Sequence, residues 1–207
     1  MPHSKIAVVE GKWSDKTNLS VKSFFDLMSD LIFKTPHAYH YEMFCDLMSL
    51  KNIVTRMSRA RGIKYIYIGA HGTPNNIKAL GGSITRAELR SILHKFTGTS
   101  IFGVFLSTCA FGNEDNIDYL LRPTRDAVTS IKWIAGYTKD IDWIDSAALD
   151  MLFWNSFFSS EGSQIARIEY VASELKRLVP GLIKELGFCI YRRGPRADSP
   201  VVNLVTY

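Results

Sequence analysis

The chain has 207 residues, of which 46% are hydrophobic and 22% charged, proportions typical of one globular domain over residues 1–207 and not of a disordered chain. No apolar stretch approaches the ~20 residues that a membrane-spanning helix needs, and no signal-peptide pattern follows the first five residues, so we expect a cytoplasmic location without membrane contact. The net charge of +5 comes without a basic motif interleaved with aromatic residues, which argues against nucleic-acid binding.

Strand and helix patterns alternate through the first third of the chain. A short apolar run at 6–9 predicts a first strand, and apolar residues at helical spacing predict a helix over 21–32. A short second strand over 38–41, a helix over 44–57 and a strongly apolar strand over 64–70 are expected next. This order is that of βαβ units, which build parallel sheets.

The middle of the chain contains a hairpin signal and a helix-start signal. Adjacent glycines within 76–84 predict a small hairpin rather than a phosphate loop. Thr85 stands three residues before Glu88, the reciprocal spacing of a capping box, so we expect a helix to begin there. A strand that ends at Cys109 follows.

The second half repeats the alternation. Helices are expected over 114–121, from Asp145 to 158, over 164–179 and after Pro180, and strands over 131–137, 188–192 and 201–206. No linker or internal repeat divides the chain. The sequence therefore predicts one α/β domain with a mainly parallel sheet and helices on both faces.

Two short motifs close two of the predicted strands. Residues 70–72 read Ala-His-Gly and residues 107–110 read Ser-Thr-Cys-Ala. Parallel strands would deliver His71 and Cys109 to the same edge of the sheet, where open α/β sheets gather catalytic groups. A thiol with an imidazole base is suited to nucleophilic catalysis. Gly72 permits a close backbone approach, so the amides of Gly72 and Cys109 are candidates for an oxyanion hole.

Each of these two residues alone has a common structural role. A cysteine at the end of a buried strand is most often a small apolar filler, and a histidine before glycine is often a turn residue. Their joint placement, each just past an apolar run with one helix between them, favours a functional pair.

The remaining chemically distinctive residues have structural interpretations. Cys45 and Cys189 are expected to be core thiols, and the three cysteines form neither a disulfide set nor a metal-ligand pair, so we expect no metal or cofactor. His94 is expected on the surface of its helix. The four tryptophans, Trp13, Trp133, Trp143 and Trp154, are expected in the core and in helix packing.

The two motifs resemble those of the caspase-like (clan CD) cysteine peptidases. The sequence Leu-Ser-Thr-Cys-Ala-Phe-Gly at 106–112 is most similar to the CHAT branch, whose motif typically reads Leu-Ser-Ala-Cys-Glu-Thr-Gly, with departures at Thr108 and at 110–111. The strand Ile-Ala-Gly-Tyr at 134–137, the acidic turn after it and the aromatic helix to 158 also look like that branch, so the resemblance covers about residues 63–158. It implies a caspase-like three-layer α/β/α sandwich with a mainly parallel central sheet.

The resemblance also implies an activity. It makes the chain a cysteine endopeptidase in which His71 is the general base, Cys109 the nucleophile, and the amides of Gly72 and Cys109 the oxyanion donors. A protein substrate would be hydrolysed through an acyl-enzyme without a cofactor. Relatives often carry fused sensor modules, so a separate activating or inhibitory protein partner is expected. In bacteria, stand-alone domains of this sort suggest roles in regulated cell death or antiviral defence.

Four residues are candidates for the pocket that receives the substrate side chain: Asp140, Asp142, Asp145 and Ser107. A buried carboxylate among them would favour arginine or lysine. Structural roles compete with this interpretation. Asp145 has the features of a helix N-cap, Asp140 and Asp142 those of turn residues, and a strand-end serine usually satisfies backbone groups.

Two other functions are consistent with the same fold class. The first is a catalytically inactive caspase-like module that binds partner proteins, which thiol reactivity at Cys109 would distinguish from a peptidase. The second is a nucleotide or phosphate binder, which is disfavoured because neither Gly-x-Gly-x-x-Gly nor Gly-x-x-x-x-Gly-Lys-Ser/Thr follows a predicted strand.

Overall fold

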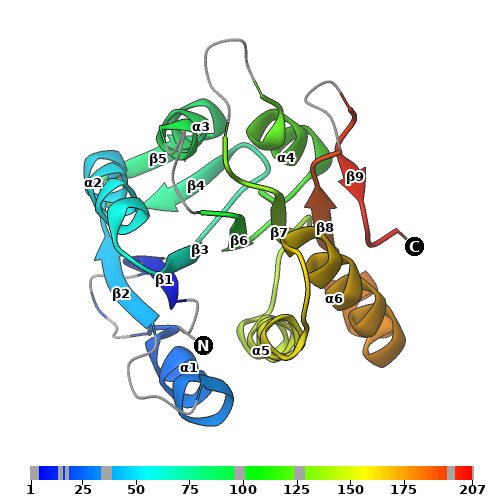
Figure 1. Ribbon diagram of the computed structural model, residues 1–207. Helices are drawn as coiled ribbons and strands as arrows, with labels where there is room; N and C mark the ends of the chain where they lie inside the picture. The colour runs from blue at the N-terminus through cyan, green and yellow to red at the C-terminus, as the bar shows by residue number, and fades with distance from the viewer. Residues whose placement is uncertain are drawn as a thin grey trace.

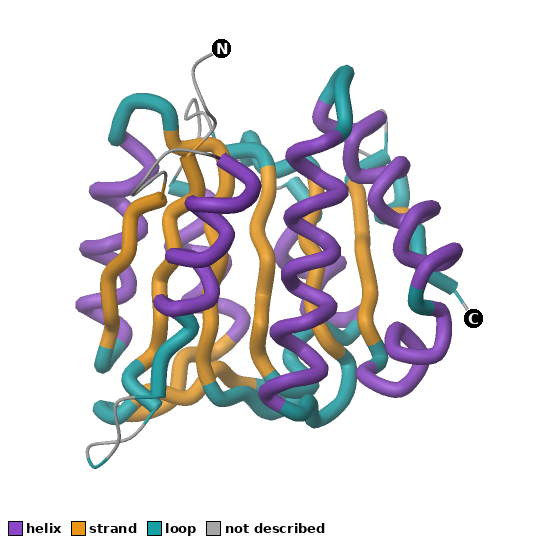
Figure 2. The backbone as a smooth tube through the Cα atoms, turned by 90° about the horizontal axis from the view of Figure 1, so that it is seen from below, coloured by secondary structure: helices purple, strands orange, loops and turns teal. Residues whose placement is uncertain are grey.

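The computed structural model describes residues 5–13, 16, 19–33, 39–95, 101–123, 129–194 and 199–206. Seven strands form one sheet in the order β2-β1-β3-β6-β7-β8-β9, and β4 and β5 form a separate hairpin. Helices cover both faces of the large sheet, as Figure 1 and Figure 2 show. This arrangement confirms the expected α/β/α sandwich.

The sheet is mixed and mostly parallel. Neighbouring strands from β2 to β7 run parallel, whereas β8 and β9 are antiparallel to their neighbours. The strands are β1 (Lys5–Gly11), β2 (Tyr39–Phe44), β3 (Ile63–Ala70), β4 (Asn76–Ala79), β5 (Gly82–Thr85), β6 (Gly103–Thr108), β7 (Trp133–Tyr137), β8 (Phe188–Arg192) and β9 (Val202–Asn203). The helices are α1 (Lys22–Met28), η1 (Ser29–Phe33), α2 (Leu47–Arg59), α3 (Arg86–His94), α4 (Glu114–Leu121), α5 (Trp143–Ser159), α6 (Gln164–Leu178) and α7 (Pro180–Leu186).

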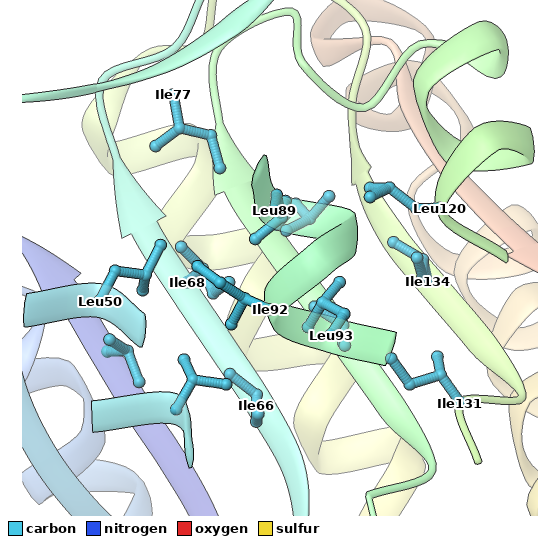
Figure 3. Packing of buried hydrophobic residues seen from close by; sticks show 14 of the residues in the cluster. Leu50, Ile66, Ile68, Ile77, Leu89, Ile92, Leu93, Leu120, Ile131 and Ile134 are labelled. Atoms are coloured by element: carbon cyan, nitrogen blue, oxygen red, sulfur yellow. The ribbon is translucent and has the colours of Figure 1, made fainter. Parts of the chain in front are cut away.

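Alternate side chains of the central strands enter different helical layers. In β3, Ile66 and Ile68 belong to an aliphatic cluster with residues of α2, α3 and α4, whereas Tyr65 and Tyr67 belong to an aromatic-rich cluster with residues of α1, α5 and α6. Figure 3 shows the aliphatic cluster, which includes Leu50, Leu89, Ile92, Leu93, Leu120 and Ile134. Each such side chain contributes about 1.5–3 kcal/mol on burial, so both layers hold the strand ends in place.

Capping interactions decide where the helices begin. Thr85 and Glu88 form the expected capping box at α3, and α4 has the expected bounds. The prediction that Asp145 starts α5 was wrong. The Asp142 side chain accepts hydrogen bonds from the backbone amides of Ile144 and Asp145, so the helix begins at Trp143. A residue two or three positions before the free amides is the one that can reach them.

The second strand is longer than its apolar pattern suggested. β2 extends to Phe44, which the sequence pattern placed in the next helix, because Asp46 caps α2 and delays its start to Leu47. The expected first residue of this strand, Ala38, lies outside the described residues. Cys45 therefore sits between strand and helix and is exposed, so the prediction of a core thiol was wrong there.

The remaining cysteine, two of the tryptophans and His94 are all buried, which agrees with the sequence prediction for all of them except His94. Cys189, Trp133 and Trp154 are buried, as expected. His94 is also buried, which contradicts the predicted surface position, because its Nε2 donates to the Leu120 carbonyl at 3.0 Å. In the described ranges, no helix has the length and apolarity to cross a membrane, and no three histidine, cysteine or acidic side chains gather into a metal site.

Candidate active site

His71 and Cys109 leave the sheet side by side. β3 and β6 are adjacent and parallel, and their register pairs Ala70 with Thr108, so the next residue of each strand emerges at the same edge. The predicted juxtaposition of His71 and Cys109 is therefore what the sheet produces. The reason is the parallel pairing, which places carboxyl ends of neighbouring strands together.

A cavity of about 390 Å³ opens at this edge, and both residues line it. The other lining residues come from the β1–α1 loop, α1, β3, β6, the β7–α5 loop and the first half of α5: Trp13, Ser20, Val21, Ser23, Phe24, Tyr67, Ala70, Ser107, Ile141, Trp143, Ser146, Ala147 and Asp150. Cys109 is partly exposed and His71 is exposed. A ligand in this cavity would thus meet an accessible thiol and an accessible imidazole.

The backbone at Gly72 lies against the backbone at Cys109. A Cβ atom added to Gly72 would lie 2.3 Å from the Cys109 carbonyl oxygen and 3.0 Å from the Cys109 nitrogen, so only glycine fits. Within the described residues, the Gly72 amide donates no hydrogen bond to another group. Two backbone donors this close together are suited to an anionic oxygen.

Replacing Gly72 with alanine is expected to lower the free energy of unfolding by about 1–3 kcal/mol, because the new methyl group forces the two loops apart. Gly181→Ala is the matched control, since a Cβ there meets nothing within 4 Å and alanine favours the helix that contains it. Urea unfolding of both variants measures the difference. Equal stabilities would show that the loops separate without cost.

The chain turns sharply directly after Cys109. The Phe111 amide donates to the Cys109 carbonyl at 2.7 Å around Ala110, whose φ of 55° lies in the left-handed region. The Ala110 amide is held by the Lys139 carbonyl at 2.9 Å, beyond the end of β7. Backbone strain of this kind is typical of functional sites, and here it places Cys109 at the tip of its strand.

Asn116 ties the loop after His71 to the loop after Cys109. Its buried Nδ2 donates to the Pro74 carbonyl at 2.8 Å and to the Phe111 carbonyl at 3.0 Å. Asn113, the N-cap of α4, donates a second bond to Pro74 at 2.9 Å. These amides fix the two loops relative to one another. No pattern in the sequence identifies either residue, because nothing local links them to Pro74.

Asp150 is the acidic residue of the cavity. It is almost fully buried and accepts hydrogen bonds from the hydroxyls of Tyr137 at 2.5 Å, Tyr67 at 2.8 Å and Ser107 at 3.0 Å. Burial raises the pKa of Asp150 to about 7, against the opposing effect of these three hydroxyl donors. No lysine or arginine pairs with it in the described part of the chain.

The predicted pocket residues are only partly at the cavity. Ser107 lines it and contacts Asp150, whereas Asp140, Asp142 and Asp145 are not among its lining residues. Asp142 is occupied as the N-cap of α5, and Asp145 lies in the first turn of that helix. No pattern in the sequence identifies Asp150, which lies one helical turn after Ser146 and Ala147 on the face of α5 that lines the cavity.

Two tryptophans stand beside His71 rather than in the core. The Trp13 ring lies 4.9 Å from the His71 ring and 4.9 Å from the Trp143 ring, centroid to centroid, in T-shaped contacts. Both indoles line the cavity, and Trp143 is 41% exposed. The expectation that all four tryptophans are core residues was therefore wrong for these two.

Known proteins resemble this chain in structure but not in sequence. No protein-family model matches it, and no curated protein matches its sequence. Gingipain R, described as an Arg-specific cysteine proteinase, matches with a TM-score of 0.58 and 9% identity over 89% of this chain and 44% of that one. Caspase-1 from Spodoptera frugiperda matches with a TM-score of 0.51 and 12% identity over 84% of this chain and 78% of that one. The fold is caspase-like, and this chain spans less than half of gingipain R.

Proposed function

We propose, from the caspase-like fold and the cavity at its sheet edge, that this protein is a cysteine peptidase. The observation that supports this most directly is that His71 and Cys109 follow adjacent parallel strands and line one cavity. The motif at 106–112 supports a place near the CHAT branch within the caspase-like peptidases.

The proposed reaction uses groups already at the site. His71 takes the proton of the Cys109 thiol, and the thiolate attacks the carbonyl carbon of the scissile peptide bond. The amides of Gly72 and Cys109 stabilise the oxyanion that forms, and the close approach of the two backbones supports this role. The C–N bond breaks as His71 returns the proton to the leaving amine. A water molecule, deprotonated by His71, then hydrolyses the thioester.

The cavity supports a substrate with a basic side chain. Asp150 is the one acidic side chain among the described residues that line the cavity, and no lysine or arginine lines it. Burying a carboxylate costs free energy, and without a cationic partner most of that cost is not compensated. An arginine or lysine side chain of the substrate would compensate it by forming an ion pair with the carboxylate. Asp150, held by a hydrogen bond from Ser107, therefore takes the pocket role for which Asp140, Asp142 and Asp145 are the candidates in the sequence.

Thiol reactivity tests the proposed pair without knowledge of the substrate. Cys109 is expected to react with iodoacetamide at pH 7 about 10-fold faster than Cys45, because the His71 imidazole takes the thiol proton as the sulfur attacks. Cys45 is exposed and serves as a control within the same molecule. The rates are read by mass spectrometry of the labelled peptides.

The same measurement on His71→Ala completes the test. The rate at Cys109 is expected to fall to that of Cys45, and the rate at Cys45 is expected not to change. A Cys109 that reacts no faster than Cys45 in the native chain, with or without His71, would contradict the peptidase and favour an inactive interaction module.

A further inference from the structure

We infer that Trp13 positions the His71 imidazole for the proposed reaction, and that the buried carboxylate of Glu10 holds Trp13 in place. This inference rests on the proposed function for its catalytic consequence. Its structural content, a histidine oriented by an indole, stands on the contacts of the β1–α1 loop. Trp13 is a positioning residue, since it acts through His71.

The His71 ring has few other constraints. No hydrogen bond within the described residues involves its ring nitrogens, and its ring contact is with Trp13 at 4.9 Å and an interplanar angle of 89°. An edge-to-face aromatic contact contributes about 0.5–1.5 kcal/mol beyond area burial. Packing against the indole is therefore the interaction that favours one ring orientation over free rotation in solvent.

Trp13 is itself held from two sides. Its Nε1 donates to the Glu10 carboxylate, and its ring contacts Trp143 at the start of α5. An added Cβ at Gly69, two residues before His71, would lie 3.7 Å from Trp13 Cζ2, so the indole lies over the end of β3. The indole is thus fixed to the same strand that delivers His71.

Glu10 is fully buried, and its carboxylate collects donors from three segments. Besides Trp13 Nε1, it accepts the Val21 amide at 2.8 Å, the Ser20 hydroxyl at 2.6 Å and the Tyr41 hydroxyl at 2.5 Å. A carboxylate offers about four acceptor positions, so these four donors satisfy it without a cation. An apolar residue at this position could not accept these hydrogen bonds. Through them the buried Glu10 side chain links Trp13, Ser20 and Val21 to β1.

Orientation of a catalytic histidine has a large effect on rate. In many hydrolases a carboxylate orients the imidazole by a hydrogen bond, and misplacement by about 1 Å can cost about 10²-fold. No carboxylate contacts His71 in the described residues. In this protein, packing of the Trp13 indole against the His71 ring restrains that ring, as a hydrogen bond to a carboxylate does in those hydrolases.

The test compares Trp13→Leu, which keeps apolar volume without a ring, with Trp13→Phe, which keeps a ring without the Nε1–H donor. On a peptide substrate, Trp13→Leu is expected to lower kcat about 10-fold to 100-fold with KM within threefold. Trp13→Phe is expected to lower kcat less, by about threefold to tenfold, because the ring stays while its hydrogen bond to Glu10 is lost. A structural role alone would not separate the two variants. Thermal unfolding of both confirms that they fold.

A second readout does not depend on catalysis. NMR relaxation of the His71 ring is expected to show fast motion in Trp13→Leu, intermediate motion in Trp13→Phe, which lacks the hydrogen bond to Glu10, and a restrained ring in the native chain. Failure of the native chain to cleave peptides would contradict the proposed function and leave this readout valid. An equally restrained ring in Trp13→Leu, or a raised KM with unchanged kcat, would overturn the inference and make Trp13 a substrate contact.

Discussion

Cys109→Ala is expected to abolish peptide cleavage, with kcat falling by about 10³-fold or more. The alanine has no group that can attack the carbonyl, so the acyl-enzyme cannot form, and only the weak effect of the binding site and oxyanion donors is left. Cleavage of fluorogenic peptides with arginine or lysine before the scissile bond measures the loss. The fold should persist, because Cys109 lies at a strand tip and is only partly buried.

Cys45→Ala is the matched control for this experiment. Cys45 is an exposed cysteine at the end of β2, away from the lining of the cavity, and its replacement is expected to leave cleavage unchanged. Circular dichroism and thermal unfolding establish that both variants are folded. If Cys109→Ala cleaves as fast as the native chain, the nucleophile is another group and the proposed mechanism is wrong.

Asp150→Asn is expected to remove the preference for basic side chains. The amide keeps the shape of the carboxylate but has no charge, so kcat/KM for arginine and lysine peptides should fall by about 10²-fold while that for matched leucine peptides changes little. The loss should be mainly in KM. Agmatine binding to the Cys109→Ala protein, measured by calorimetry, tests the same site without cleavage and should disappear when Asp150→Asn is added.

The same carboxylate predicts a dependence on pH. Because burial raises the pKa of Asp150 to about 7, the group is charged above that pH and protonated below it. The ratio of kcat/KM for arginine over leucine peptides should therefore rise as pH increases from 6 to 8, and it should stay level in Asp150→Asn. Using the ratio cancels any pH dependence of the chemical step that the two peptides share. A ratio that is level in the native chain would show that Asp150 does not meet the substrate.

Most of the fold was predictable because the signals for it are local. The apolar run of β3, the capping box of Thr85 and Glu88, and the bounds of α4 each depend on residues within a few positions of one another, and each prediction was confirmed. The errors arose where two local signals competed. Asp142 and Asp145 are both suitable caps, and the contact of Asp142 with the free amides decided between them.

The sequence by itself determined the meeting of His71 and Cys109, because two parallel strands joined by one helix bring their carboxyl ends to one edge. Only the tertiary structure showed what surrounds them. Asp150 joins Tyr67 across 83 positions of sequence, and Glu10 joins Tyr41 across 31. Such contacts depend on how each helix is rotated against the sheet and how each loop crosses its edge. Periodicity gives the buried face of an element but not its partner, so the acid of the cavity and the support of His71 became visible only in the folded chain.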